Sequence, residues 1–308
     1  MTALRSALGD YLRIRRQLGY ELKNDGRLLE GFVDFLQQAG ARHITTDLAV
    51  AWAKLPADAR PLTWRQRLGM VRGFARYLAT IDPDSEVPAR DLLIARQQRV
   101  APYIYSEQEI VALLAAARRL GPPLRAATFE AVIGLMASTG LRIGEALGLD
   151  RHDVDLRDGV LHVRAAKRHR QREVPMHPTT TEALRAYARR RDRLCPATAS
   201  PAFFVNLRGG RLGEGSFRDV FPRLIGEVGL EGCGQRVRPR PHDLRHAFAV
   251  RTLLDWHRAG GDVQRELPRL TTFLGHAQPG ATYWYLQAVP ELLELVGQRL
   301  DGALGDVS

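Results

Sequence analysis

The chain has 308 residues, a net charge of +11 and an isoelectric point near 10.3. Hydrophobic residues make up 45% and charged residues 26%, which is typical of a globular protein and argues against a disordered chain. No apolar run approaches the ~20 residues that a membrane-spanning helix needs, so we expect no membrane association. Cys195 and Cys233 show no metal-binding spacing, which predicts no zinc site and favours the cytoplasm. The positive charge indicates a polyanionic partner.

Residues 1–100 show helical periodicity of apolar residues throughout. Thr46 and Asp47 are typical of a helix start, and another helix is expected from about Thr63 to Ala79. This last helix carries a stripe of arginines on a face outside its apolar side: Arg65, Arg72 and Arg76. The stripe predicts either a surface that follows phosphates or an ordinary solvated face. Three arginines alone favour the solvated face.

A turn-rich segment then separates two parts of the chain. Pro83 and Pro88 begin it, a basic stretch from Arg90 to Val100 continues it, and Pro102 closes it. We therefore predict a helical domain at 1–81, a linker at 82–103 and a second domain at 104–308. Both parts carry net positive charge, so both are expected to contact the same polyanion.

The second part predicts a mostly α-helical domain with a small antiparallel β-hairpin or sheet. Ser106 and Glu109 form a capping-box pattern that opens a helix through Arg119. A strongly apolar helix follows at 124–138 and ends at Gly140. Short strands are expected at 160–163 and 173–176 around a basic turn, with further helices at about 180–194, 215–228, 244–256 and 289–300.

Two arginine motifs stand out in this part. Arg142 follows Gly140 at a helix entry, and Glu145 comes one turn later. Arg142 can offer its planar guanidinium to a phosphate, although by itself the motif favours an ordinary surface ion pair. The predicted hairpin carries five cationic side chains with no acidic residue among them: Arg164, Lys167, Arg168, Arg170 and Arg172. This density favours a hairpin tip that enters a nucleic-acid groove over a merely solvated tip.

Two histidine motifs follow. His242 and Arg245 are three residues apart at a helix start, so they point the same way and can share a phosphate oxygen and a proton. A capped helix with an unrelated histidine is an equal alternative. Gly275-His276 precedes Tyr283 and Tyr285, and a tyrosine hydroxyl serves as a nucleophile only with cations around it. Two core aromatics are the commoner explanation of such tyrosines.

Taken together and in this order, the motifs resemble the tyrosine recombinase, or phage integrase, family. The resemblance covers about 103–290, and residues 1–100 are similar to the family's core-binding domain. Members usually place the nucleophile nine residues after the second histidine, which here gives Tyr285. Two departures, a Pro-Gly between histidine and tyrosine and a long stretch at 260–276, resemble transposon-borne integrases.

The resemblance implies a mixed α/β catalytic domain that cuts and rejoins DNA through a covalent 3′-phosphotyrosine. Arg142 and Arg245 would hold the phosphate, Lys167 would protonate the leaving oxygen, His242 would take the proton of Tyr285, and His276 would donate to the phosphate. Glu145 would support Arg142. No metal, ATP or other cofactor is expected, since the sequence has neither a phosphate-binding Gly-rich loop nor a convincing carboxylate cluster.

The resemblance also implies partners. We expect double-stranded DNA clamped between the two domains, with contacts from Arg65, Arg72, Arg76, Arg164, Arg168, Arg170 and Arg172, and a homotetrameric synapse on the DNA. The resemblance leaves five points open: the target site, partner recombinases, accessory factors, the direction of the reaction, and whether the C-terminal tail packs in cis or in trans. Two alternatives remain: a type IB topoisomerase, which relaxes supercoils as a monomer, and a DNA-binding scaffold without catalysis.

Overall fold

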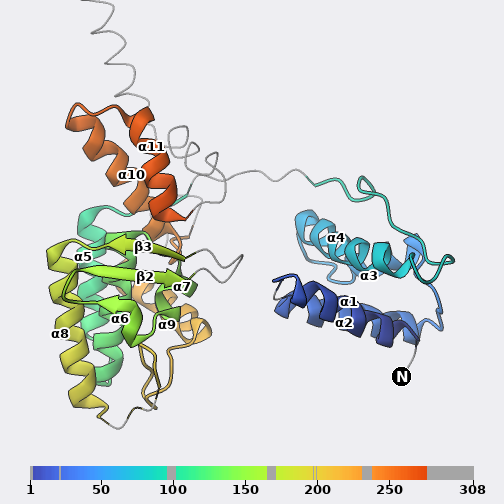
Figure 1. The fold of residues 1–308 in the computed structure, drawn as a ribbon, viewed down its shortest axis with the longest axis horizontal. Helices are drawn as coiled ribbons and strands as arrows, with labels where there is room; N and C mark the ends of the chain where they lie inside the picture. Colours follow the sequence, from blue (N-terminus) through green and yellow to red (C-terminus); the bar gives the residue numbers. More distant parts are fainter. Residues whose placement is uncertain are drawn as a thin grey trace, which may run out of the picture. The chain divides into compact units, whose positions relative to one another are not determined.

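The computed structural model describes residues 3–20, 22–95, 102–164, 171–196, 198, 200–230 and 238–275. The chain divides into two compact units, residues 1–99 and 100–308 (Figure 1). Most of the described residues are helical, and a small antiparallel sheet lies in the second unit, which confirms the predicted fold class. Among the described residues, no helix combines the length and apolar character needed to cross a membrane.

The first unit consists of four helices around one apolar core (Figure 1). They are α1 (Ala3–Gln17), α2 (Lys23–Gln38), α3 (Thr46–Lys54) and α4 (Pro61–Leu78). Helix α3 begins as predicted because the Thr45 side chain accepts a hydrogen bond from the Leu48 N–H. Helix α4 begins two residues earlier than predicted, since Pro61 occupies the first turn, where proline costs no hydrogen bond. Phe32, Trp52 and Phe74 fill the core.

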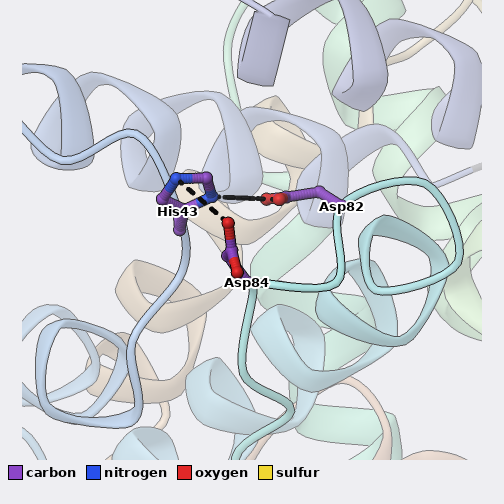
Figure 2. A group of neighbouring side chains, drawn as sticks. All are labelled: His43, Asp82 and Asp84. Atoms are coloured by element: carbon purple, nitrogen blue, oxygen red, sulfur yellow. Dashed lines mark hydrogen bonds and ion pairs between the residues drawn. The ribbon is translucent and has the colours of Figure 1, made fainter.

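The segment after α4 is tied to the loop between α2 and α3 (Figure 2). His43 Nδ1 lies 3.0 and 2.9 Å from the two carboxylate oxygens of Asp82, and Ser85 donates to the same carboxylate at 2.6 Å. The Ile44 N–H donates to Ser85 at 3.1 Å, and the Glu86 N–H returns to the Ile44 carbonyl at 2.7 Å. The described first part of the predicted linker therefore packs on the helical unit.

The second unit is built around a buried helix. In chain order its helices are α5 (Glu107–Arg118), α6 (Pro123–Thr139), α7 (Ile143–Gly148), α8 (Pro178–Leu194), α9 (Glu214–Glu227), α10 (Asp243–Arg258) and α11 (Val263–Leu274), with a 3₁₀ turn at Arg151–Asp153. Helix α6 packs against α5, α8 and α10, which explains why it is apolar on nearly every face. Both hydrogen bonds of the predicted Ser106–Glu109 capping box are present.

A three-stranded antiparallel sheet covers part of this unit, in the order β1 (Val154–Asp155), β2 (Val160–Arg164) and β3 (Gln171–Pro175). The register pairs Val163 with Arg172, and Leu161, Val163 and Val174 point into the core. Strands β2 and β3 were predicted, whereas the two-residue β1 was not. The tip of the hairpin, 165–170, lies outside the described residues.

Helices α10 and α11 form a separate small core beside α6 (Figure 1). Helix α11 was not predicted, although Leu267, Leu270 and Leu274 have helical spacing and pack on α10. The side chain of Asp262 caps the N-terminus of α11 by accepting hydrogen bonds from the N–H groups of Gln264 and Arg265. The helix predicted at 289–300 lies outside the described residues.

Candidate active site

The first arginine motif forms the junction between α6 and α7. Gly140 ends α6 in the left-handed conformation with φ 63°, and a Cβ there would lie 2.6 Å from the Phe248 ring. Glycine is therefore required both by the backbone and by the packing. The turn places Arg142 at the entry of α7, where its N–H donates to Glu145 Oε2 at 3.0 Å. The predicted helix entry is confirmed.

Glu145 is the centre of a group of charged side chains and is only 9% exposed. Arg142 Nη1 donates to Glu145 Oε1 at 2.8 Å, and Arg172 on β3 donates with both terminal nitrogens, at 3.1 and 2.8 Å. Burial alone would raise the pKa of Glu145, but the hydrogen bonds and charge of Arg172, followed by those of Arg142, lower it. This half-buried triad is not the ordinary surface ion pair that the isolated motif favoured.

Arg245 on α10 connects the same junction to the end of α11. The side chain is almost fully buried, and its two terminal nitrogens donate to the carbonyls of Gly140 at 2.7 Å and Leu274 at 2.6 Å. Arg142 Nη2 reaches the next carbonyl along, that of Gly275, at 3.2 Å. Two guanidiniums from motifs about 100 residues apart in the sequence therefore meet adjacent peptide groups.

His242 lies at the start of α10, four residues before His246, whose ring it meets edge-on at 4.7 Å between centroids. Although the residue keeps an exposed surface, its ring loses solvation, and the nearby guanidiniums of Arg245, Arg142 and Arg240 disfavour its protonated form. Together these effects lower the pKa of His242 to about 4. The imidazole is therefore neutral at neutral pH.

This shift makes stability depend on pH. The pKa of histidine in the unfolded chain is near 6.5, whereas the pKa of folded His242 is about 4. The contribution of neutral His242 to the stability of the fold is therefore complete above pH 6.5 and is lost as the pH falls towards 4. We expect the free energy of unfolding to fall more steeply from pH 7 to pH 5 for the wild type than for His242→Asn. Urea denaturation at pH 7, 6 and 5 measures this, and parallel curves would contradict it.

Asp243 was not singled out from the sequence, yet it is fully buried beneath this motif. Its carboxylate accepts from the Arg240 N–H at 2.8 Å and from Arg240 Nη2 at 3.2 Å, and burial raises its pKa. The contact shapes the turn that presents His242. A cation two residues before the histidine and an acid directly after it were the signal available in the sequence.

The remaining predicted site residues are placed only in part. Lys167, Arg168, Arg170, His276 and Tyr285 lie outside the described residues. Arg164 on β2 pairs with Asp153 at 2.6 Å and contacts the ring of His152 at 2.7 Å. Arg172, which is predicted as a DNA contact, donates to Glu145 and has a side chain only 12% exposed.

The arginine stripe of α4 lies on one surface of the first unit. Arg65 and Arg76 are exposed, and Arg72 is half-buried. Partial burial and the neighbouring charges of Arg76, Arg90 and Arg65 lower the pKa of Arg72, so the cations are near one another. Arg65 donates to the Ala95 carbonyl at 2.8 Å, and Arg72 donates to the carbonyls of Pro88 and Ala89. Each guanidinium has further N–H donors for an anion.

Within the described part of the chain, two groups of side chains combine histidine with carboxylates in metal-binding proximity: His43 with Asp82 and Asp84, and His152 with Asp150 and Asp153. The first holds two loops together through its own hydrogen bonds, as Figure 2 shows. The second is neutralised by Arg164 and Arg211.

Comparison with known proteins decides the family. The model of the "Phage integrase family" matches residues 104–291. The chain belongs to the phage integrase family. It is a tyrosine-type site-specific recombinase, as the order of its motifs predicted. A protein of Sinorhizobium fredii named "Putative integrase/recombinase y4rB" is 42% identical over 98% of this chain and 98% of its own length.

Further relatives agree. The tyrosine recombinase XerC of Actinobacillus pleuropneumoniae is 30% identical and covers 90% of this chain and 86% of its own. Among solved structures, the Tn1549 transposon integrase in complex with transposon right end DNA covers 98% of this chain and 100% of its own, with a TM-score of 0.66 at 17% identity. XerH bound to its difH substrate superposes with a TM-score of 0.65, covering 89% of this chain and 78% of its own, at 19% identity. These two likenesses show the fold.

Proposed function

We propose that Arg142, Arg245 and His242 belong to the recombinase active site, and that the two arginines bind the scissile phosphate of DNA. The observation that carries this proposal is that Arg142 and Arg245, from two separate motifs, donate to the adjacent carbonyls of Gly275 and Leu274. Both guanidiniums lie beside the point where the chain continues to His276. Arg142, with its side chain 39% exposed, keeps N–H donors for an external anion.

The reaction follows from these groups. The hydroxyl of Tyr285 attacks phosphorus, the bond to the 5′ oxygen breaks, and a 3′-phosphotyrosine forms. His242, neutral at neutral pH, accepts the tyrosine proton, and Lys167 gives a proton to the leaving 5′ oxygen. Arg142 and Arg245 offset the charge that develops on the non-bridging oxygens, and His276 donates a hydrogen bond to one of them. The ester energy is retained in the new bond, so the strands can be rejoined without ATP.

The same proposal assigns the other parts. The N-terminal helical unit contacts duplex DNA through the α4 surface with Arg65, Arg72 and Arg76, and the hairpin contacts it through Arg164, Arg168 and Arg170. Recombination between two sites requires several copies on DNA, and we propose a tetramer that acts in the cytoplasm. A lambda integrase tetramer bound to a Holliday junction has the same fold, with a TM-score of 0.59.

A plasmid assay tests this function against relaxation by a topoisomerase. The substrate is a supercoiled plasmid that carries two copies of the recombination site, selected beforehand from a randomised library by trapping the protein on nicked duplexes. We expect deletion or inversion between the sites, and no such product from a plasmid with one site. Relaxation of both plasmids without any exchange product would contradict the proposal.

DNA affinity should also fall steeply with salt because phosphate contacts release counterions.

A further inference from the structure

Arg172 differs from Arg164, the other described cation of the hairpin, which pairs with Asp153 and has a half-exposed side chain. Arg172 is nearly buried, and all three of its described contacts face the inside of the catalytic unit. Two go to Glu145, at 3.1 and 2.8 Å, and the third goes from its Nε to the Phe273 carbonyl at 2.9 Å. One side chain on β3 thus reaches both α7 and the end of α11.

Gly275 has no side chain, which leaves room for the guanidinium of Arg172. Gly275 has φ 66°, and a Cβ there would lie 2.7 Å from Arg172 Nη1 and 2.9 Å from its Cζ. The left-handed turn that ends α11 and the position of Arg172 therefore depend on each other. The Gly275 carbonyl also receives Arg142 Nη2, so the turn serves both arginines.

We infer that Arg172 is a positioning residue for cleavage, which acts through Glu145 on Arg142; this rests on the proposed phosphate-binding role of Arg142. Glu145 accepts the N–H and Nη1 of Arg142 from one side and the guanidinium of Arg172 from the other. The two fixed partners hold the carboxylate in one rotamer, and that carboxylate sets the direction of Arg142.

Charge gives Arg172 a second effect. A carboxylate paired with Arg142 alone would compete with DNA phosphate for the same guanidinium. Because Arg172 also pairs with Glu145, the triad carries a net charge of +1 instead of zero, and Arg142 remains attractive to an anion. The bond from Arg172 to Phe273 fixes the segment that leads into His276.

The test is a double-mutant cycle in the full-length protein, with Arg172→Gln, Arg142→Ala and the double variant. The readouts are the single-turnover rate of covalent adduct formation at saturating protein, and the affinity for uncleaved DNA at several salt concentrations. We expect Arg172→Gln to lower the rate about 10- to 100-fold, because the residue acts on the transition state through Arg142. Affinity should fall by no more than about fivefold and the salt slope should stay unchanged, because the variant weakens the attraction of Arg142 for an anion but removes no phosphate contact. In the double variant, Arg172→Gln should lower the cleavage rate little further than Arg142→Ala does alone.

Arg211→Gln is the matched control. Arg211 also bridges a carboxylate and two carbonyls near α7, with bonds of 2.8 and 3.1 Å to Leu147 and Leu149, but it does not touch Glu145. Its cleavage rate per folded molecule should equal that of the wild type. If Arg172→Gln does not fold, Arg172→Lys carries the same test, since lysine keeps the charge but not the three directed bonds, and an intermediate rate is expected.

Three outcomes would overturn the inference. One is a wild-type rate in Arg172→Gln, and another is a loss that multiplies with that of Arg142→Ala. The third is a decrease in affinity with a salt slope lowered by about one, which would make Arg172 a direct phosphate contact. If Arg142→Ala itself cleaves at the wild-type rate, the proposed role of Arg142 fails instead.

Discussion

Arg245→Ala is expected to lower the rate of covalent adduct formation by about 10³-fold, the scale of losing a preorganised donor to transition-state charge. The same change removes the donor from the carbonyls of Gly140 and Leu274, both of which lie in the buried junction of α6, α10 and α11. Each unsatisfied buried carbonyl costs about 1–3 kcal/mol, so the loss of both bonds should lower the free energy of unfolding by roughly 2–6 kcal/mol. Urea denaturation and single-turnover cleavage measure the two effects.

Arg191→Ala separates stability from chemistry. Arg191 is as buried as Arg245, 3% against 1% exposed, and donates to the Phe203 carbonyl at 2.8 Å, far along the chain from the arginine and histidine motifs. The variant leaves the Phe203 carbonyl without this donor and should lose about 1–3 kcal/mol of stability, but it should keep the wild-type cleavage rate per folded molecule. Equal cleavage defects in Arg191→Ala and Arg245→Ala, at equal folded fractions, would mean that Arg245 serves only the fold.

The sequence predicts a feature of this fold well where one local pattern determines it. The apolar helix at 124–138 is predicted because α6 is enclosed by α5, α8 and α10, so the apolar pattern is continuous. Its end is predicted because Gly140 is the residue type that adopts the left-handed conformation without cost. Helix α11 also has a local pattern, because Leu267, Leu270 and Leu274 have helical spacing and Asp262 is a typical N-cap residue. This helix was nevertheless not predicted from the sequence.

The site is less predictable because its contacts join distant segments. The spacing of Arg142 and Glu145 indicates their ion pair, but the pairing of Glu145 with Arg172 depends on how β3 docks beside α7. From the sequence Arg172 is one of several hairpin cations, and only the fold distinguishes it from Arg164, which pairs with Asp153. Likewise, the bonds from Arg65 and Arg72 to 88–95 depend on the path of the chain after α4.

The residues of the first histidine motif alone favour neither of two explanations, and the family resemblance favours one of them. By itself, the spacing of His242 and Arg245 fits a capped helix as well as a phosphate site. In the structure Arg245 is buried on two carbonyls, and the pKa of His242 falls to about 4 beside three guanidiniums. The proposed phosphate site accounts for this arrangement.

Tyr285→Phe should abolish cleavage completely, because removing the hydroxyl removes the atom that bonds to phosphorus. Tyr283→Phe is the matched control, since it makes the same chemical change two residues earlier and should leave the rate close to that of the wild type. Binding to uncleaved DNA should be unchanged in both variants, as neither loses a charge.

The most direct measurement of the central claim is the trapping of the covalent adduct on a nicked duplex that carries the selected site, followed by peptide mapping of the modified residue. We predict a stable adduct for the wild type and for Tyr283→Phe, none for Tyr285→Phe, and a nucleotide attached to the peptide that contains Tyr285. An adduct from Tyr285→Phe in wild-type yield, or its loss in Tyr283→Phe alone, would contradict the account.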